Sequence, residues 1–205
     1  MLKDLSITEF LQQTASAEPL PGGGCTAALN AALAAGLTEM VANLTIGRKE
    51  FQTVEDDMKK IVQAAANLRQ KLENDIDNDA QAYQAVLAAF KLPKQTDDEK
   101  KQRSDAIQLA FKSAAKVPMS VARDALIIMD LASRAIARGN PNAVTDVAVA
   151  VLAARTAALA AAYNVKINLG AVKDSDFVEE LSREVEDLEK KAIRKEKEIL
   201  AHIKI

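Results

Sequence analysis

Histidine, cysteine and tryptophan are almost absent from this sequence of 205 residues. It has one His (His202, near the C-terminal end), one Cys (Cys25) and no Trp. No Ser–His or Cys–His pair can therefore supply a nucleophile and its base, and neither a His-rich metal site nor a Glu-x-x-His di-iron bundle can form. A lone Cys makes no intramolecular disulfide, so we expect a reducing, cytoplasmic location.

Abundant aromatic residues and an excess of basic charge, two features of nucleic-acid-binding surfaces, are also missing. Aromatic side chains make up 3% of the sequence, which leaves few platforms on which bases can stack. Lys and Arg number 27 and Asp and Glu 29, so the formal net charge is −2. We therefore expect no nucleic acid among the partners of this protein.

Glycine and proline are scarce as well, with seven and five residues, whereas alanine is abundant, with 39. Few helix breakers and many copies of the strongest helix former indicate long, closely packed helices. The length and an ordinary balance of 49% hydrophobic and 27% charged residues indicate one globular domain over residues 1–205. The expected fold class is all-α, a bundle of long Ala-rich helices.

Two apolar stretches are long enough to be considered as membrane spans, Cys25–Leu44 and Ala143–Tyr163. The first contains Glu39, and the second contains Asp146 and Arg155. A charge in the middle of a bilayer is costly, and Ala contributes little to offset that cost. We therefore interpret both stretches as buried helices of a bundle and expect no membrane partner.

Capping motifs and the helical spacing of apolar residues predict six helices. The expected caps are capping boxes that begin at Ser6 and Asp176, and N-caps at Thr96 or Asp97 and at Asn142. Pro118 removes one backbone hydrogen bond, so we expect a kink or a break near Val117. Val165–Leu169, between the fifth and sixth helices, is expected to be a short extended connector. The predicted helices run from Ser6 to about Ala17, Cys25 to about Ile46, about Thr53 to Phe90, Thr96 or Asp97 to Arg138, Asn142 to Asn164, and Asp176 to the C-terminus.

Three of the seven glycines stand together in Pro21-Gly22-Gly23-Gly24, directly before a predicted helix. Glycines let a ligand approach bare backbone N–H groups, and a helix N-terminus adds partial positive charge. This segment is therefore either an anion or carbonyl site or only a tight entry into a closely packed helix. Cys25 follows it, and without a His to act as base we interpret this residue as small and buried.

Asp75, Asp79 and Tyr83 follow one another at intervals of four residues on the third predicted helix, so they share one face. Two acids and a phenol on one stripe can hold a cationic or amidine-like substrate and exchange protons with it. The alternative is a solvated helix face, because several other acidic and amide residues lie next to them.

Further candidates lie near the ends of the second and fifth predicted helices. Asp146 precedes a wholly apolar run, so it either interacts with the helix dipole or belongs to a site. Asn164 and Asn168 can read the donors and acceptors of a heterocycle, or can be a helix cap and a turn residue. Arg48 and Lys49 can bind the carboxylates of a ligand or simply be solvated.

Three groups of residues form a joint pattern: Pro21–Gly24 with Met40–Lys49, Asp79–Tyr83 with Lys91–Lys94, and Asn142–Asp146 leading to Asn164–Leu169. This pattern resembles the cyclodeaminase/cyclohydrolase family, which includes the C-terminal domain of formiminotransferase-cyclodeaminase and stand-alone bacterial folate enzymes. The resemblance extends from the first helix to about Asp174. Cys25 and Thr145 depart from it, because each stands where the family pattern leads us to expect Ser.

The resemblance implies an all-helical homodimer that acts on a one-carbon adduct of tetrahydrofolate. A cyclodeaminase closes 5-formiminotetrahydrofolate to 5,10-methenyltetrahydrofolate with loss of ammonia. A cyclohydrolase opens the methenyl bridge with water to give 10-formyltetrahydrofolate. Both reactions shuffle protons around a cationic or tetrahedral centre and need no metal, nicotinamide or covalent intermediate. The residues do not decide between them.

The resemblance also selects site residues. Asp79 and Asp146 become the expected catalytic carboxyls, followed by Lys91. Asp146, in its apolar run, should have the raised pKa and act as the acid, whereas Asp79 should stay ionised. The expected substrate-binding residues are Pro21, Gly22, Gly23, Gly24, Arg48, Lys49, Asp75, Tyr83, Thr145, Asn164 and Asn168.

Two other readings stay open. One is a helical dimerisation module whose last helix forms a coiled coil, and the other is a folate-binding protein without turnover. An apolar pocket with convergent acids and amides would favour an enzyme or a binding protein over a scaffold. A homodimer is expected from the residues too, because Ala-rich helices leave small side chains on several faces.

Overall fold

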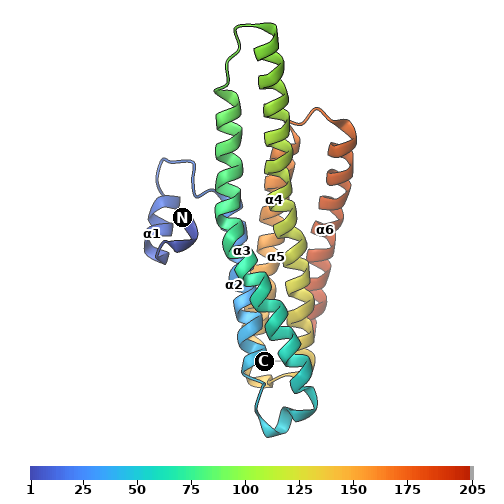
Figure 1. The fold of residues 1–205 in the computed structure, drawn as a ribbon. Coiled ribbons are helices and arrows are strands. Elements are labelled where there is room, and N and C mark those ends of the chain that lie inside the picture. Colours follow the sequence, from blue (N-terminus) through green and yellow to red (C-terminus); the bar gives the residue numbers. More distant parts are fainter. Residues whose placement is uncertain (204–205) are drawn as a thin grey trace.

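The structure, a computed structural model, describes residues 1–203 and is an elongated bundle of helices (Figure 1). The all-α prediction is confirmed, since the described part of the chain contains no β-strand. The helices are α1 (Ile7–Thr14), α2 (Gly23–Asn43), α3 (Glu55–Phe90), α4 (Asp97–Arg138), α5 (Val144–Leu169) and α6 (Ser175–Ala201), with short 3-10 helices at Leu2–Asp4, Lys49–Val54 and Pro141–Ala143.

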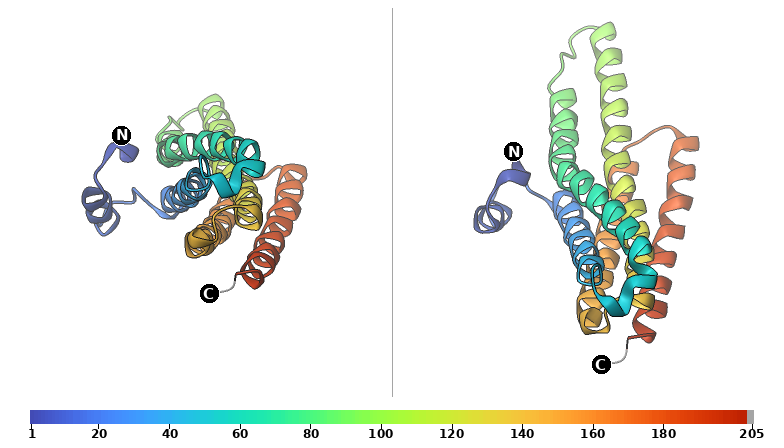
Figure 2. Two further views of the ribbon diagram at one scale, coloured as in Figure 1. Left: turned by 90° about the horizontal axis from the view of Figure 1, so that it is seen from below. Right: turned by 60° about the horizontal axis from the view of Figure 1, so that its bottom comes forward.

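The centre of the bundle is packed largely from alanine. α2 lies against α3, α4 and α5, and α6 packs on α4 and α5 (Figure 2). Ala28, Ala31 and Ala35 on α2 and Ala154 and Ala161 on α5 have no exposed surface. Because such small side chains let neighbouring helices approach closely, the abundance of alanine is used for helix-on-helix packing.

α2 and α5 run antiparallel, which gives this pair two distinct ends. At one end the start of α2 meets the end of α5, where Gly23 lies beside Asn164. At the other end the backbone N–H of Asn140 donates to Oγ1 of Thr45. We call this second end the turn end; it comprises residues 44–49 and 139–146.

α3 and α4 continue past the start of α2 and form a two-helix arm (Figure 1). A small apolar cluster of Val86, Ala89, Ala110 and Ala114, separate from the main core, holds the two helices of the arm together. The arm is therefore stabilised by its own contacts and extends beyond the rest of the bundle.

The N-terminal segment stands off to the side of the bundle (Figure 2). The expected capping box at Ser6 is confirmed: its hydroxyl accepts from the N–H of Glu9, whose carboxylate accepts from the N–H of Ser6. The preceding 3-10 turn is tied to α3, because the N–H of Leu2 donates to Oδ1 of Asp77 over 2.7 Å. α1 itself leaves much of its apolar surface exposed.

The extended connector expected at Val165–Leu169 is wrong, because α5 continues through these residues. Val165 and Leu169 are one helical turn apart, and both are buried in the core. Nδ2 of Asn168 also donates to the carbonyl of Asn164, one turn earlier. A continued helix thus buries two large side chains that an extended segment would have separated.

The break expected near Val117 is also wrong, because α4 runs without interruption through Pro118. Pro118 is buried, and Ala115, Met119 and Ala122 around it pack in the core. Tertiary packing on both sides of the proline therefore holds the helix together despite the missing hydrogen bond.

Helix boundaries otherwise lie within about three residues of the expected ones, but two caps differ. α6 ends at Ala201, and the last two residues of the helix expected to reach the C-terminus lie outside the described residues. Thr96 is confirmed as the N-cap of α4. Asn140 rather than Asn142 accepts the capping hydrogen bond before α5, because a 3-10 turn precedes that helix. Asp174 rather than Asp176 caps α6, through the N–H of a residue three positions later.

Candidate active site

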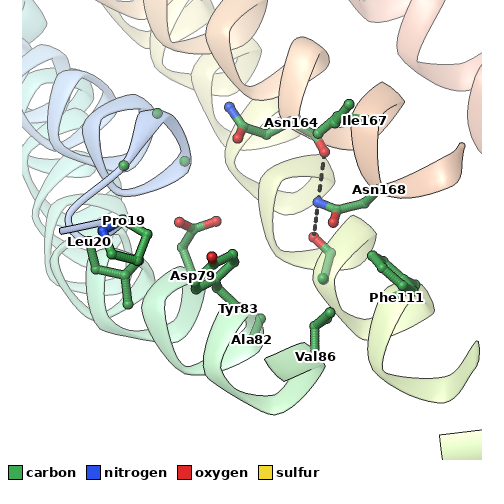
Figure 3. Close-up of a pocket in the computed structure, with 14 residues that line it drawn as sticks. Pro19, Leu20, Asp79, Ala82, Tyr83, Val86, Phe111, Asn164, Ile167 and Asn168 are labelled. Atoms are coloured by element: carbon green, nitrogen blue, oxygen red, sulfur yellow. Dashed lines mark hydrogen bonds between the residues drawn. The ribbon is translucent and has the colours of Figure 1, made fainter. Parts of the chain in front are cut away.

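A cavity of about 410 Å³ opens where the start of α2 meets the end of α5. Its size is that of small-molecule sites. Figure 3 shows side chains from α3, α4 and α5 around it. The lining residues are Pro19, Leu20, Gly22, Gly23, Gly24, Asp79, Ala82, Tyr83, Val86, Phe111, Ala114, Asn164, Ile167 and Asn168.

The three glycines bring the N-terminal end of α2 to the cavity. Gly22 is the N-cap of α2 and has no side chain with which to cap it. A Cβ at Gly24 would lie 2.1 Å from Oδ1 of Asp79, so only a hydrogen atom fits there. The glycines thus let this carboxyl approach the helix end, where partial positive charge favours an anion.

Asp79 is the one carboxyl among the described lining residues. The thiol of the buried Cys25 donates to its Oδ2, with Sγ 3.3 Å away. Burial raises the pKa of Asp79, and hydrogen bonds from the thiol and the backbone N–H of Cys25 oppose this shift. Burial, together with the negative charge of Asp79, raises the pKa of Cys25 to about 12, so the thiol stays protonated and is a hydrogen-bond donor.

Asn164 and Asn168 line the cavity from the last turns of α5 (Figure 3). Nδ2 of Asn164 donates to the carbonyl of Ala160 over 2.9 Å. Nδ2 of Asn168 donates to the carbonyls of Asn164 and Ala114 over 2.8 and 3.1 Å. Because both amide nitrogens are engaged, the two Oδ1 atoms are left to accept hydrogen bonds from N–H groups of a ligand.

The carbonyl of Ala114 can accept a hydrogen bond from Asn168 because α4 contains a proline. In a regular helix this carbonyl would accept from the N–H of residue 118, four positions later. Pro118 has no N–H, so the acceptor is left for the side chain of Asn168. The proline that does not break α4 therefore provides an anchor for a cavity residue.

The remaining walls are apolar. Tyr83 and Val86 face the cavity from α3, Phe111 from α4 and Ile167 from α5. Such walls bind a flat ring system, while the amide oxygens and Asp79 receive polar groups at its edge. The arrangement therefore suits a heterocycle that carries N–H donors and a reacting centre close to the carboxyl.

Seven of the predicted site residues line this cavity: Gly22, Gly23, Gly24, Asp79, Tyr83, Asn164 and Asn168. Pro21 is buried beside them without lining the cavity. Burial raises the pKa of Asp79, whereas an ordinary carboxylate was expected at this position.

Asp75 does not join Asp79 in the cavity, contrary to expectation. It is buried one helical turn away, and its Oδ2 lies 3.0 Å from Nζ of Lys71, which also pairs with Asp124 of α4. α4 covers α3 at Asp75, whereas the start of α2 leaves the space beside Asp79 open. The common helix face was predicted correctly, but packing divides it between an ion-pair cluster and the cavity.

Arg48, Lys49, Thr145 and Asp146 lie at the turn end, far from the cavity. α2 separates the two ends and has 21 residues, a length of about 30 Å. The structure therefore does not bring Asp146 and Asp79 together within one chain, and the shared catalytic role of these two carboxyls stays a prediction.

Lys91 lies at the tip of the arm. It is the exposed C-cap residue of α3, and the length of helix back to Asp79 is about 18 Å. Lys91 is not among the described residues that line the cavity. Within one chain Lys91 therefore does not reach the cavity, and its catalytic role stays a prediction.

Sequence reasoning missed the thiol donor of Cys25 and the apolar walls formed by Val86, Phe111 and Ile167. The burial of Cys25 was predicted correctly, but its contact with Asp79 joins two helices that are far apart in sequence. Helical spacing from Asn164 would have indicated Ile167 if α5 had been extended. Nothing local marks Phe111, since the packing of α4 against α3 determines where it points.

The sequence and the fold of this chain are similar to those of known proteins. Residues 6–187 match the model of a family described as formiminotransferase-cyclodeaminase. The chain belongs to this family. It is 42% identical over 183 residues to a methenyltetrahydrofolate cyclohydrolase of Methylorubrum extorquens, covering 89% of this chain and 88% of that one.

Two further relatives extend the comparison within the family. A formimidoyltransferase-cyclodeaminase of Rattus norvegicus is 32% identical over 91% of this chain, which spans only 35% of that longer protein. The crystal structure of a formiminotetrahydrofolate cyclodeaminase from Thermotoga maritima superposes with a TM-score of 0.88 at 30% identity, over 99% of this chain and 98% of that one. The family resemblance inferred from the motifs is confirmed.

Proposed function

We propose that this protein is a folate one-carbon enzyme that hydrolyses 5,10-methenyltetrahydrofolate to 10-formyltetrahydrofolate. One observation carries the proposal: Asp79, a half-buried carboxyl with a raised pKa, stands in an apolar cavity between the N-terminus of α2 and two amide oxygens. A carboxyl whose pKa is shifted towards neutrality can both accept and return a proton, which this reaction requires.

Asp79 is the proposed general base and acid of the hydrolysis. A water forms a bond to the cationic methenyl carbon and gives one proton to the carboxylate. The bond from this carbon to N5 then breaks, N5 takes up a proton from Asp79, and the carbon becomes the formyl group on N10. The second proton of the water leaves to solvent, so the net reaction releases one proton.

A second candidate is the cyclodeaminase reaction, supported by the match to the Thermotoga maritima structure. Here N10 attacks the formimino carbon and loses its proton, and the departing nitrogen takes up a proton and leaves as ammonia. The same carboxyl can serve both transfers. We place hydrolysis first because the relative at 42% identity carries the cyclohydrolase name.

We propose further that the enzyme acts as a cytoplasmic homodimer without nucleic-acid or membrane partners. Both candidate reactions are proton transfers at carbon and nitrogen, so the proposed chemistry uses no metal or nicotinamide and needs no covalent intermediate. The near-balance of charge and the single Cys support the same picture.

Absorbance of the methenyl chromophore tests the proposal. Incubation with 5,10-methenyltetrahydrofolate should bleach the chromophore faster than buffer alone, and Asp79→Asn should slow this by about 10²–10⁴-fold. Asp187→Asn, an exposed carboxyl on α6, is the matched control and should keep full activity. Formation of the chromophore from 5-formiminotetrahydrofolate instead would assign the cyclodeaminase reaction. Tight folate binding without turnover would leave a binding protein, and no folate binding would leave a helical dimerisation module.

A further inference from the structure

The side-chain amide of Asn164 is held in one orientation at the wall of the cavity (Figure 3). Its Nδ2 donates to the carbonyl of Ala160 over 2.9 Å. A flip of the amide would place Oδ1 against that carbonyl, and two oxygens that only accept hydrogen bonds repel each other. Oδ1 of Asn164 is therefore a fixed hydrogen-bond acceptor.

A backbone donor lies directly beside this acceptor. Gly23 is the first residue of α2, so its N–H has no carbonyl one turn earlier in the helix to which it could donate. A Cβ on Gly23 would lie 3.4 Å from Nδ2 and 3.8 Å from Oδ1 of Asn164, so the backbone of α2 and this amide are in close proximity. The cavity therefore presents a donor and an acceptor next to each other.

Four polar groups follow one another along this wall of the cavity. Asp79 meets α2 at Gly24, where a Cβ would lie 2.1 Å from its Oδ1. The N–H of Gly23 comes next, then Oδ1 of Asn164, and then Oδ1 of Asn168, one helical turn further along α5. Nδ2 of Asn168 donates to two backbone carbonyls, so its Oδ1 is likewise an acceptor. The order along the wall is thus carboxyl, donor, acceptor and acceptor.

One edge of a 4-oxopteridine ring carries the complementary groups in the same order. Around this ring N5 is followed by the carbonyl oxygen O4, by the N3–H and by the 2-amino group. O4 accepts a hydrogen bond, whereas N3–H and the amino group donate, so each faces its opposite in the wall of the cavity. N5, which is one end of the one-carbon bridge in the proposed substrate, then lies beside Asp79.

We propose that Asn164 and the N–H of Gly23 determine which pteridine rings the cavity accepts, and that they select a 4-oxopteridine over a 2,4-diaminopteridine. Gly23 donates to O4, and Oδ1 of Asn164 accepts from N3–H. Oδ1 of Asn168 accepts from the 2-amino group, which both kinds of ring carry. This inference rests on the proposed function, because it places the ring of that substrate against the polar wall.

A 2,4-diaminopteridine reverses the pattern at the two selective positions. Its N3 carries a lone pair, which faces Oδ1 of Asn164, and its 4-amino group points an N–H at the N–H of Gly23. Two hydrogen bonds become two repulsive contacts, and the amide of Asn164 cannot turn to relieve them because Ala160 holds it. A site built for one hydrogen-bonding pattern strongly rejects a ligand that leaves its polar groups unpaired, so we expect a preference of about 100-fold or more for the 4-oxo ring.

Binding of a matched pair of ligands tests this selection without any turnover. The pair is 5-formyltetrahydrofolate and its 4-amino-4-deoxy analogue, which differ only at positions 3 and 4 of the ring. Isothermal titration calorimetry at pH 8, where the diamino ring is uncharged, should give a Kd about 100-fold or more lower for the 4-oxo compound. Equal Kd values, expected if the amide oxygens accept from N8–H at another edge of the ring, would overturn the inference.

The same titration separates this inference from the proposed function. A protein that prefers the 4-oxo compound but turns over no folate would support the selection and refute only the proposed reaction. Binding of neither compound would refute the folate site itself and with it both proposals.

Replacement of the two Asn residues separates their parts. Asn164→Leu, of similar size, removes the acceptor for N3–H, so the ratio of the two Kd values should fall about 10-fold. Asn168→Ala is the control: both Kd values should rise and their ratio should stay the same, because both compounds carry the 2-amino group. Circular dichroism checks folding, and Asn164→Ala replaces Asn164→Leu if the latter unfolds. An unchanged ratio in the folded Asn164 variant would overturn the assignment of this residue.

The backbone donor can be removed as well, because proline is tolerated as the first residue of a helix. Gly23→Pro deletes the N–H, whereas the control Gly23→Ala adds a side chain and keeps the N–H. A Cβ at Gly23 lies at ordinary contact distance from Asn164, so we expect both variants to fold, which circular dichroism checks. The ratio of the two Kd values should be about 10-fold lower in Gly23→Pro than in Gly23→Ala. Equal ratios in these two variants would show that the N–H does not bind O4 and would overturn its part in the selection.

Discussion

The pKa of Asp79 is subject to opposing effects of its surroundings. The N-terminus of α2 and the donors of Cys25 favour its charged form, whereas its burial disfavours that form and prevails. The balance leaves the carboxyl able to exchange protons with a ligand. It also predicts how the stability of the protein changes with pH.

Replacement of Asp79 by Asn should raise the thermal stability at pH 8. Because the pKa of Asp79 is higher in the folded than in the unfolded state, the stability it contributes is complete below the unfolded pKa and is lost as pH rises through the folded pKa. At pH 8 the wild type carries an ionised, half-buried carboxylate that Asn lacks. We expect a gain in Tm of roughly 2–4 °C at pH 8, vanishing towards pH 3, by scanning calorimetry. A lower Tm of the variant at pH 8 would contradict the assigned direction of the shift.

Cys25 should tune the pH profile of turnover through its hydrogen bond to Asp79. In Cys25→Ser a stronger donor stabilises the carboxylate, so the acidic limb of the kcat/KM profile should move to lower pH by roughly 0.4–1 unit. Cys25→Ala removes the donor and should move the limb to higher pH by a similar amount. Stopped-flow rates from pH 4 to 9 measure both shifts. Identical profiles for all three proteins would show that the thiol only fills space.

Gly24 and Gly23 should respond differently to alanine. A methyl group at Gly24 would meet Asp79 at 2.1 Å and displace it, so Gly24→Ala should lower kcat by about 10²-fold or more. At Gly23 the nearest atom is Nδ2 of Asn164 at 3.4 Å, so the methyl fits but narrows the ligand's path to the backbone. Gly23→Ala should therefore weaken folate binding with little loss of Tm. A parallel loss of Tm and affinity at Gly23 would mean that this glycine serves packing alone.

At the level of whole elements, the proline within α4 affects how Asn168 is held in the cavity. Pro118 leaves the carbonyl of Ala114 free for Asn168. Pro118→Ala restores a helical N–H that competes for this carbonyl, so KM should rise about 5-fold, the equivalent of about 1 kcal/mol for one neutral hydrogen bond. Tm should stay the same or rise, because the helix regains a bond. Steady-state kinetics and calorimetry on the same samples measure the two effects; a fall in Tm with unchanged KM would assign Pro118 a purely structural part.

For the molecule as a whole, the proposed homodimer should affect the thermal unfolding of the protein. If folding and association are linked, Tm rises with protein concentration. We expect an increase of a few degrees in Tm between about 1 and 100 µM for the wild type. Leu33→Glu should show none, because Leu33 is a large apolar side chain, 57% exposed on α2, where a charge would oppose contact with a partner. Calorimetry over this concentration range, with Ile193→Glu on α6 as control, measures this dependence. A concentration-independent wild type would indicate a monomeric folding unit.

Local chemistry in the sequence determined much of this protein. Helix propensity and Ala content predicted the all-α bundle, side-chain caps such as Ser6 and Thr96 predicted two helix starts, and the motifs predicted the family. These features depend on neighbours three or four residues apart, which a sequence displays directly. The glycine loop, Asp79 and the two Asn residues were found in the same way.

Tertiary structure alone decided which candidates meet. Asp75 and Asp79 share a helix face, but α4 covers the first and the start of α2 leaves the second open. Asp146 has every local mark of a site residue and lies at the far end of α5. The packing of helices against one another buries Asp79 and thereby shifts its pKa. The same packing produces the contact between Asp79 and Cys25 and the unbroken course of α4. Contacts between residues that are distant in sequence leave no periodic pattern in the amino-acid sequence. Such contacts exist only in the assembled bundle.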